Sequence, residues 1–221
     1  MAKQATQAPL NRDKVLAAAV GVADAGGLAA LTIRSLAQEL GVKPMSLYHH
    51  VPNKEAIIDG IVDVVFAEID LPPADADWRT ALHHRAHSAR SVLRRHPWAT
   101  AVMESRAHPG PATLRHHDAV IATLRRGGFP FALAAHAYAL LDSYVYGFAL
   151  TETALPFDPQ DAAGAAEEFL AAFPADAYPH LAEFTREHVL APGYDHGAEF
   201  DYGLELILDG LARRLAAARA G

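Results

Sequence analysis

Residues 31–50 read LTIRSLAQELGVKPMSLYHH, a run whose residue types have the spacing of a helix-turn-helix. Thr32 is a good helix N-cap, and Gly41 tolerates the left-handed conformation that would end the first helix after about two turns. Pro44 suits the first position of the second helix, because the amide that proline lacks would have no partner there. Ala37 is small where the two helices must approach closely, and apolar contacts between them would come from Leu36, Leu40, Val42 and Leu47.

The second helix of this run is then free to present a polar face, which carries Lys43, Ser46, Tyr48 and His50. Met45 on the same face is suited to contact a thymine methyl group. The pattern therefore predicts a helix that reads base edges in DNA. Two short helices that simply pack in a bundle can have the same spacing, so this alternative stays open on spacing alone.

Helices are also expected on both sides of this run. Asn11 would cap a preceding helix, and Gly26-Gly27 would end it. Asn53 would cap a following helix that is strongly apolar. Four helices thus fit into residues 11–69.

The remainder of the chain repeats apolar residues at three- and four-residue steps, which is typical of helices, and no segment alternates as a strand does. The two prolines of 71–77 mark a junction, so we expect a flexible tail over 1–10, a helix-turn-helix domain over 11–69 and a helical domain over 70–221. The expected fold class is all-α, with further helices near residues 78–95, 98–106, 110–127, 130–153, 161–172, 178–190 and 197–219.

The charge is distributed unevenly along the chain. The net charge of −7 over 221 residues disfavours a nucleic-acid partner when taken as a whole. Residues 1–54, however, carry six lysines and arginines against three acids, so residues 55–221 hold a net charge of −10. A basic N-terminal part on an acidic body indicates that only the N-terminal part meets an anionic partner.

Composition excludes several classes of protein. The chain has no cysteine, which rules out disulfides, thiolate zinc sites and thiol redox sensing. No window approaches the length of an apolar membrane span, and the first ten residues lack the apolar core of a secretory signal. We therefore expect a cytoplasmic protein with no membrane partner.

The run LTIRSLAQELGVKPMSLYHHVPNKEAIIDGI resembles the DNA-binding domain of the tetracycline-repressor (TetR) family. The similarity covers about residues 11–69, and FDYGLELILDGL at 200–211 resembles the last helix of the tetracycline-repressor subgroup's effector domain. The resemblance implies an N-terminal helix-turn-helix DNA-binding domain of three to four helices. It also implies a C-terminal helical domain that binds an effector and dimerises.

The resemblance also assigns roles by position. Arg34 would contact bases from the second helix, and the third helix would face base edges with Lys43, Pro44, Met45 and Ser46. Phosphates would be held by Thr32, Tyr48, His50 and Lys54. The base-facing residues vary within the family, so they indicate where reading occurs and leave the operator sequence unknown.

The family forms homodimers through two helices per subunit, which are best matched here by residues near 130–153 and 197–219. Both segments carry apolar stripes, Tyr138, Leu141, Val145 and Phe148 in one and Phe200, Leu204, Ile207, Leu208 and Leu211 in the other. These stripes could instead belong to the core of a single chain.

The effector and its contacting residues remain unidentified from sequence. This sequence lacks the residues with which tetracycline repressors bind drug and magnesium. The histidine expected after the fourth helix falls near Asp70, and the asparagine and phenylalanine expected on the fifth helix fall near Arg85 and Ala89. Tetracycline is therefore not the expected effector.

Together these features predict a ligand-responsive transcriptional regulator that is not an enzyme and needs no cofactor. We expect a repressor that binds a palindromic DNA operator as a homodimer and is released by a small-molecule effector. The alternative is a histidine-rich, metal-dependent helical enzyme, because His83 and His87 lie one helical turn apart. No third ligand is evident, so no metal site is expected. An activator, or a DNA-binding protein without an effector, is also compatible with the sequence.

Overall fold

The computed structural model describes residues 9–155, 162–172 and 174–220. These residues are predominantly helical and contain no strand, which confirms the all-α prediction. Residues 1–8 of the predicted flexible tail lie outside the described part. Contacts divide the chain into two compact units, residues 1–129 and 130–221. The boundary expected at residue 69 stays a prediction.

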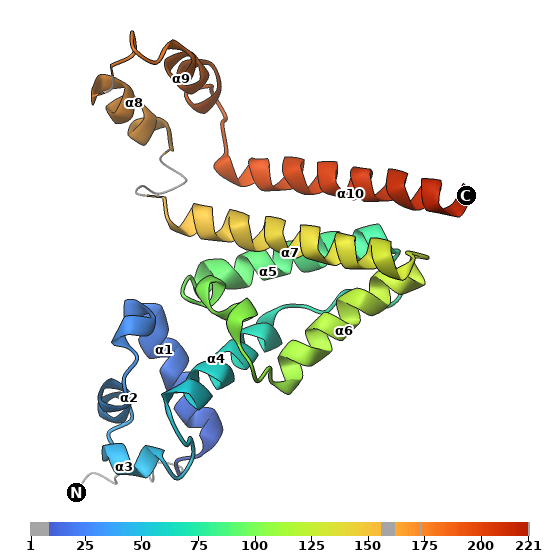
Figure 1. Ribbon diagram of the computed structural model, residues 1–221. Coiled ribbons are helices and arrows are strands. Elements are labelled where there is room, and N and C mark those ends of the chain that lie inside the picture. Colours follow the sequence, from blue (N-terminus) through green and yellow to red (C-terminus); the bar gives the residue numbers. More distant parts are fainter. Residues whose placement is uncertain (1–8, 156–161, 173, 221) are drawn as a thin grey trace, which may run out of the picture. The chain divides into compact units, whose positions relative to one another are not determined.

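The first unit holds the helix-turn-helix and the helices that follow it (Figure 1). Its helices are α1 (Arg12–Ala30), α2 (Ile33–Glu39), α3 (Pro44–Leu47), α4 (Lys54–Glu68), α5 (Trp78–Arg95) and α6 (Pro111–Arg126). Helix α4 packs against both α1 and α6, and α5 packs against α6. The best-buried apolar side chains around α4 include Val15, Leu16, Leu36, Leu47, Ile57, Ile61 and Phe66.

Caps fix the helix starts of this unit as the sequence predicts. Asn11 Oδ1 accepts a hydrogen bond from Lys14 N at 2.9 Å, and Asn53 Oδ1 accepts one from Ala56 N at 2.8 Å. Thr32 Oγ1 accepts from Ser35 N at 3.0 Å. Gly41 has a φ of 65°, so it adopts the left-handed conformation expected in the turn.

One further expectation for this unit is confirmed and another is wrong. The first regular helical segment of α1 ends at Gly26-Gly27 as predicted, because Gly27 has a φ of 70° and a ψ of 176°, and helical residues resume beyond this kink as far as Ala30. Residues 98–106 form two short 3₁₀ turns, Ala99–Ala101 and Met103–Ser105, instead of an α-helix. Ala99 and Met103 are buried at a helical spacing of four residues, but the segment forms 3₁₀ turns, and Trp98 before it donates to Asp24 on α1.

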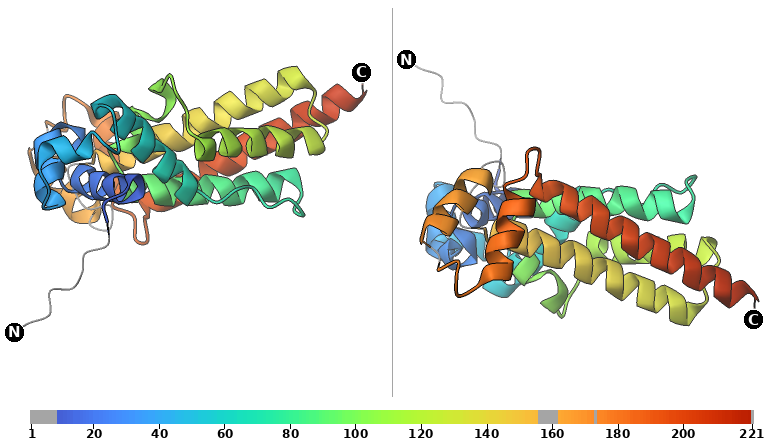
Figure 2. Two further views of the ribbon diagram at one scale, coloured as in Figure 1. Left: turned by 90° about the horizontal axis from the view of Figure 1, so that it is seen from below. Right: turned by 90° about the horizontal axis from the view of Figure 1, so that it is seen from above.

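The second unit contains α7 (Phe131–Thr153), α8 (Ala162–Ala172), α9 (Pro179–Phe184) and α10 (His196–Ala220). Helices α7 and α10 lie side by side along most of their length (Figure 2). The helix expected near 178–190 is present as α9, which continues directly into a π-helical turn at Thr185–Val189.

Tyr144 on α7 contacts α10 through both its ring and its hydroxyl group. Its ring stacks on Phe200 with centroids 5.5 Å apart, and its hydroxyl is placed to donate to the carbonyls of Glu199 at 3.1 Å and Phe200 at 3.0 Å. The hydroxyl lies so close to Gly203 that a Cβ at this position would overlap it. Glycine at 203 is therefore what allows the two helices to approach at Tyr144.

We predict that Gly203→Ala lowers the free energy of unfolding by about 1–3 kcal/mol, because the added methyl must displace a hydrogen-bonded hydroxyl. The matched control is Gly21→Ala, where a Cβ in α1 meets open space and should stabilise the chain by about 1 kcal/mol through helix propensity. Tyr144→Phe is made alone and together with Gly203→Ala, and in this double-mutant cycle the combination should recover part of the loss. Urea unfolding at fixed protein concentration measures all four variants, and equal effects of the two alanines would contradict this prediction.

Candidate nucleic-acid interface and dimerisation surface

The short helix α3 presents its side chains outward. Leu47 is its buried residue, whereas Met45 is 71% exposed and Tyr48, which follows the helix, is 44% exposed. Lys43 and Pro44 are exposed and Ser46 is half-buried. Of the four consecutive residues predicted to face base edges, three are thus exposed and Ser46 is half-buried.

Arg34 and Thr32 lie at the start of α2, and both are exposed. Thr32 is engaged locally, because its Oγ1 accepts from Ser35 N while donating to Ser35 Oγ at 3.0 Å. The hydroxyl of Ser35 continues the chain by donating to Ala30 O at 2.7 Å. A phosphate oxygen near Thr32 would therefore compete with Ser35 for the threonine hydrogen.

The predicted phosphate contacts after α3 lie close together along the chain. Lys54 is exposed at the first position of α4, where the positive end of the helix dipole also favours an anion. His50 is half-buried, and its amide donates to Leu47 O. His49 is also exposed between Tyr48 and His50, but no role was predicted for it. Its position between Tyr48 and His50, two predicted phosphate contacts, could have indicated a similar role from the sequence.

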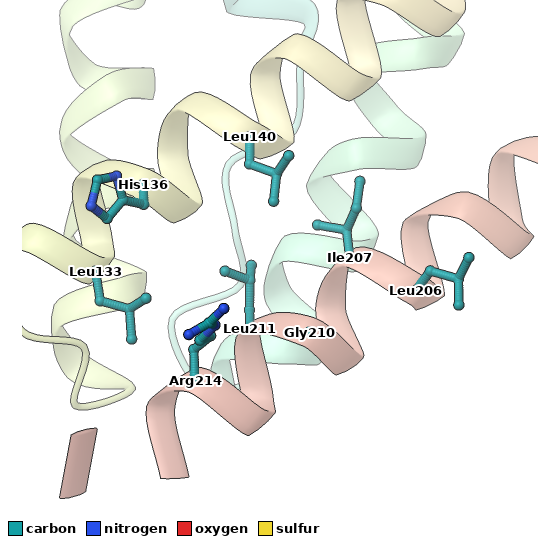
Figure 3. A pocket seen from close by; sticks show the side chains of 8 residues that line it. All are labelled: Leu133, His136, Leu140, Leu206, Ile207, Gly210, Leu211 and Arg214. Atoms are coloured by element: carbon teal, nitrogen blue, oxygen red, sulfur yellow. The ribbon is translucent and has the colours of Figure 1, made fainter. Parts of the chain in front are cut away.

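A second candidate surface lies on α7 and α10. A groove of about 650 Å³ is lined by Leu133, His136, Leu140, Leu206, Ile207, Gly210, Leu211 and Arg214 (Figure 3). Leu140 and Leu206 are each about half exposed, at 47% and 54%. Leucines exposed in an apolar groove are typical of a surface that another molecule covers.

The apolar stripes predicted for dimerisation overlap this groove only at Ile207 and Leu211. Leu141, Val145, Phe200, Leu204 and Leu208 are buried within the single chain. They belong to its core, as the alternative interpretation held. The outer face of the same two helices is formed instead by side chains between these positions, such as Leu140 and Leu206.

The first unit also buries polar groups away from the helix-turn-helix. Arg85 on α5 donates through Nε to Nε2 of His116 on α6 at 3.0 Å, and both side chains are fully buried. Burial, followed by the charges of Arg85 and His117, lowers the pKa of His116 to about 3. Because arginine only donates, the histidine proton must lie on Nδ1, which has no hydrogen-bond partner.

The histidine pair that suggested a metal site forms a ring contact. The rings of His83 and His87 lie with centroids 4.5 Å apart. In the described part of the chain, no three histidine or acidic side chains converge as a metal site requires. Of the helices described there, none has the length and apolar character needed to cross a bilayer.

Two family models match the chain. One, described as bacterial regulatory proteins of the tetR family, covers residues 15–61, and the other, described as a tetracyclin repressor-like C-terminal domain, covers residues 71–215. The chain belongs to the TetR family. Both halves of the chain therefore have counterparts in one family of regulators.

Individual TetR-family proteins are similar over nearly the whole chain. The transcriptional repressor DrrR1 of Streptomyces coeruleorubidus is 34% identical over 91% of this chain and 77% of its own length. The structure of apo ActR from Streptomyces coelicolor has a TM-score of 0.76 at 29% identity and covers 96% of this chain and 100% of ActR. ActR in complex with actinorhodin has a TM-score of 0.75 at 30% identity, over 93% and 97% of the two chains.

The protein is therefore a DNA-binding transcriptional regulator of the repressor type and not an enzyme. It binds operator DNA as a homodimer and is released by a small-molecule effector. These findings support the regulator over the histidine-rich metal-dependent enzyme.

The buried His116 predicts an acid-sensitive fold. Because its pKa is lowered from 6.5 to about 3, the unfolded chain binds a proton below pH 6.5 that the folded chain does not. The free energy of unfolding should therefore fall as the pH drops from about 6.5 towards 3, by roughly 1 kcal/mol per pH unit from this residue.

Urea unfolding between pH 4.5 and 7 measures this slope. His116→Gln should flatten it relative to the wild type, whereas the control His180→Gln removes a fully exposed histidine and should leave it unchanged. An identical slope in the wild type and His116→Gln would contradict the assignment.

Proposed function

We propose that residues 11–69 form the operator-reading domain and residues 70–221 the effector-binding and dimerisation domain. The observation that carries this proposal is the outward face of α3, which is anchored by buried Leu47 and exposes Lys43, Pro44 and Met45, with Ser46 half-buried. A helix of this kind fits the major groove, where base edges are distinguishable. Two copies would place their α3 helices about 34–36 Å apart on a near-palindromic operator.

The proposed contacts divide into two groups. Arg34, Lys43, Pro44, Met45 and Ser46 read base edges, whereas Thr32, Tyr48, His50 and Lys54 bind phosphates. Exposure of Arg34, Lys43 and Met45 supports the first group, and the position of Lys54 at the N-terminus of α4 supports the second. We add His49 to the second group, because it is exposed beside Tyr48.

The homodimer forms through α7 and α10, with a second copy seated on the groove that contains Leu140 and Leu206. The family's homodimeric assembly and the half-exposed leucines support this surface. Two α7–α10 pairs would then pack as a four-helix bundle, which is a common way to bury such faces.

The effector binds within residues 70–221, and we propose that it resembles actinorhodin more closely than tetracycline. ActR, which is 30% identical to this chain, has been solved in complex with actinorhodin. Asp70, Arg85 and Ala89 stand where tetracycline repressors have drug-contacting residues, which argues against tetracycline. The protein acts in the cytoplasm, where operator DNA is accessible.

The test is selection of bound sequences from random duplex DNA by the purified protein, followed by titration at two salt concentrations. An inverted repeat whose affinity falls as salt rises supports the proposal, because phosphate contacts release counterions. A folded dimer that enriches no motif would overturn it.

Single substitutions should separate the two groups of DNA contacts. Tyr48→Phe removes a phosphate-binding hydroxyl, so it should weaken binding to all sequences by a similar factor. Arg34→Ala should cost about 1–3 kcal/mol at one base pair and relax specificity there. Competition titrations on operators with single-base changes measure both, and unchanged affinity in both variants would contradict the docking.

A charge in the groove should disrupt the dimer. We expect Leu206→Glu to shift sedimentation at micromolar concentration from dimer to monomer and to weaken operator binding, because a carboxylate would be buried without a partner. Leu114→Glu is the matched control, since Leu114 on α6 is 56% exposed and lies outside the groove. If both variants remain dimeric, α7 and α10 do not form the interface at this position.

A further inference from the structure

Arg106 joins two carboxylates in the first turns of α4. It directly follows the 3₁₀ turn Met103–Ser105, and its side chain is only 16% exposed. Its Nη2 donates to Oε2 of Glu55 at 2.8 Å, and its Nε donates to Oδ1 of Asp59 at 2.6 Å. The side chain of Asp59 is 19% exposed, whereas that of Glu55 is 69% exposed. Arg106 is thus anchored at Asp59 and holds a glutamate that otherwise lies in solvent.

The two carboxylates need a cation between them. Glu55 and Asp59 are four residues apart, so they lie on the same face of α4 and repel each other. The hydrogen bond to Glu55, followed by the one to Asp59, raises the pKa of Arg106 above its ordinary value in spite of partial burial. Arginine presents its donors in one rigid plane, so a single guanidinium fixes the direction of both carboxylates.

Glu55 lies at the end of α4 where a phosphate contact was proposed. It is the second residue of the helix, directly after Lys54, and the Asn53 side chain caps the amide of Ala56. The first amides of a helix have no acceptor within the helix, and the positive end of the helix dipole attracts anions. An unrestrained glutamate competes with DNA here, because its own carboxylate can accept from these amides or pair with Lys54.

The bond to Arg106 prevents that competition. The guanidinium that binds Glu55 is also bound to Asp59, one turn further along α4, so the Glu55 carboxylate is held on the face of the helix that carries Asp59. Its charge is balanced there by Arg106. Helices α3 and α4 and Arg106 all belong to the first compact unit.

We propose that Arg106 is a positioning residue for operator binding: it holds the carboxylate of Glu55 away from the N-terminus of α4 and so leaves that end of the helix to a DNA phosphate. This inference rests on the proposed function, which places a phosphate at Lys54. Arg106 does this without touching DNA. Because a phosphate contact carries no sequence information, the effect is the same on all sequences.

The experiment is a double-mutant cycle of Arg106 and Glu55, with affinity measured for the selected operator and for an unrelated duplex. Arg106→Gln should weaken binding to both about tenfold, or about 1.4 kcal/mol, because the dimer carries a released glutamate in each copy. Glu55→Gln alone should change the affinity by less than about twofold, since the carboxylate is already held back, but in the Arg106→Gln background it should recover about fivefold. Independent charge effects would instead add, and Glu55→Gln would give the same gain in both backgrounds.

Arg95→Gln is the matched control. It also removes one positive charge and takes an arginine partner from a carboxylate of α4, because Arg95 Nη2 donates to Oε2 of Glu68 at 2.7 Å. Glu68 ends α4 and lies about 20 Å from Glu55 along the helix axis, which exceeds the Debye length of about 8 Å at physiological salt. Arg95→Gln should therefore keep the affinity for DNA within about twofold of the wild type.

Arg106→Lys serves if Arg106→Gln fails to fold. Lysine keeps the positive charge but lacks the planar fork that binds two carboxylates at once, so binding to both duplexes should weaken about threefold. Adding Glu55→Gln should relieve this loss as well.

The outcomes separate this inference from the proposed function. If the Arg106 variants bind DNA as the wild type does, or if Glu55→Gln gives the same gain in both backgrounds, Arg106 does not position Glu55 and the proposed function stands. A lower melting temperature of Arg106→Gln without coupling to Glu55 has the same meaning. If Lys54→Gln leaves the affinity unchanged, or if wild-type protein selects no inverted repeat, the proposed function fails at that point and this inference fails with it.

Discussion

The packing of α4 is the constraint on which the first unit depends. Most of its apolar residues are buried almost completely, among them Ile57, Ile61, Val65 and Phe66. Gly60 is needed where α1 crosses, because a Cβ there would lie 2.5 Å from a methyl carbon of Leu16. A helix buried on so many sides cannot move without moving its neighbours.

Hydrogen bonds along α4 also join this helix to later elements of the first unit. Near its start, Arg106 donates to Glu55 at 2.8 Å and to Asp59 at 2.6 Å. One turn further on, Asp63 accepts from the amide of Thr113 at 2.8 Å and so caps the beginning of α6. At the end of α4, Glu68 Oε2 accepts from Arg95 Nη2 at 2.7 Å and lies 3.2 Å from His96 Nε2. The helix is thus bonded to later elements at several points between Glu55 and Glu68.

Local sequence signals predicted the helix-turn-helix well, because caps and turns act within a few residues. Asn11, Thr32 and Asn53 cap where expected, and Gly41 turns where expected. Predictions failed where similar local patterns have different tertiary outcomes. Residues 98–106 have helical spacing, yet the segment forms 3₁₀ turns and Trp98 is held by Asp24 from a distant helix.

Helices α7 and α10 also show the difference between what local sequence patterns predict and what tertiary packing decides. Both helices were predictable from their periodicity, but hydrophobicity alone does not distinguish a stripe that fills the core of one chain from a stripe that a second chain covers. The structure places Leu141 and Leu204 in the core and leaves Leu140 and Leu206 exposed, because the rotation of each helix depends on its packing partner.

The amino-acid sequence alone established an all-α chain, the position of its helix-turn-helix and the TetR resemblance, since all three depend on short-range residue patterns. Only the tertiary structure brought His96 to Asp24, 72 residues earlier, and to Glu68. It also buried His116 against Arg85 and separated core from outer face on α7 and α10. Such contacts join residues that no local pattern relates, because they form only when whole helices have packed.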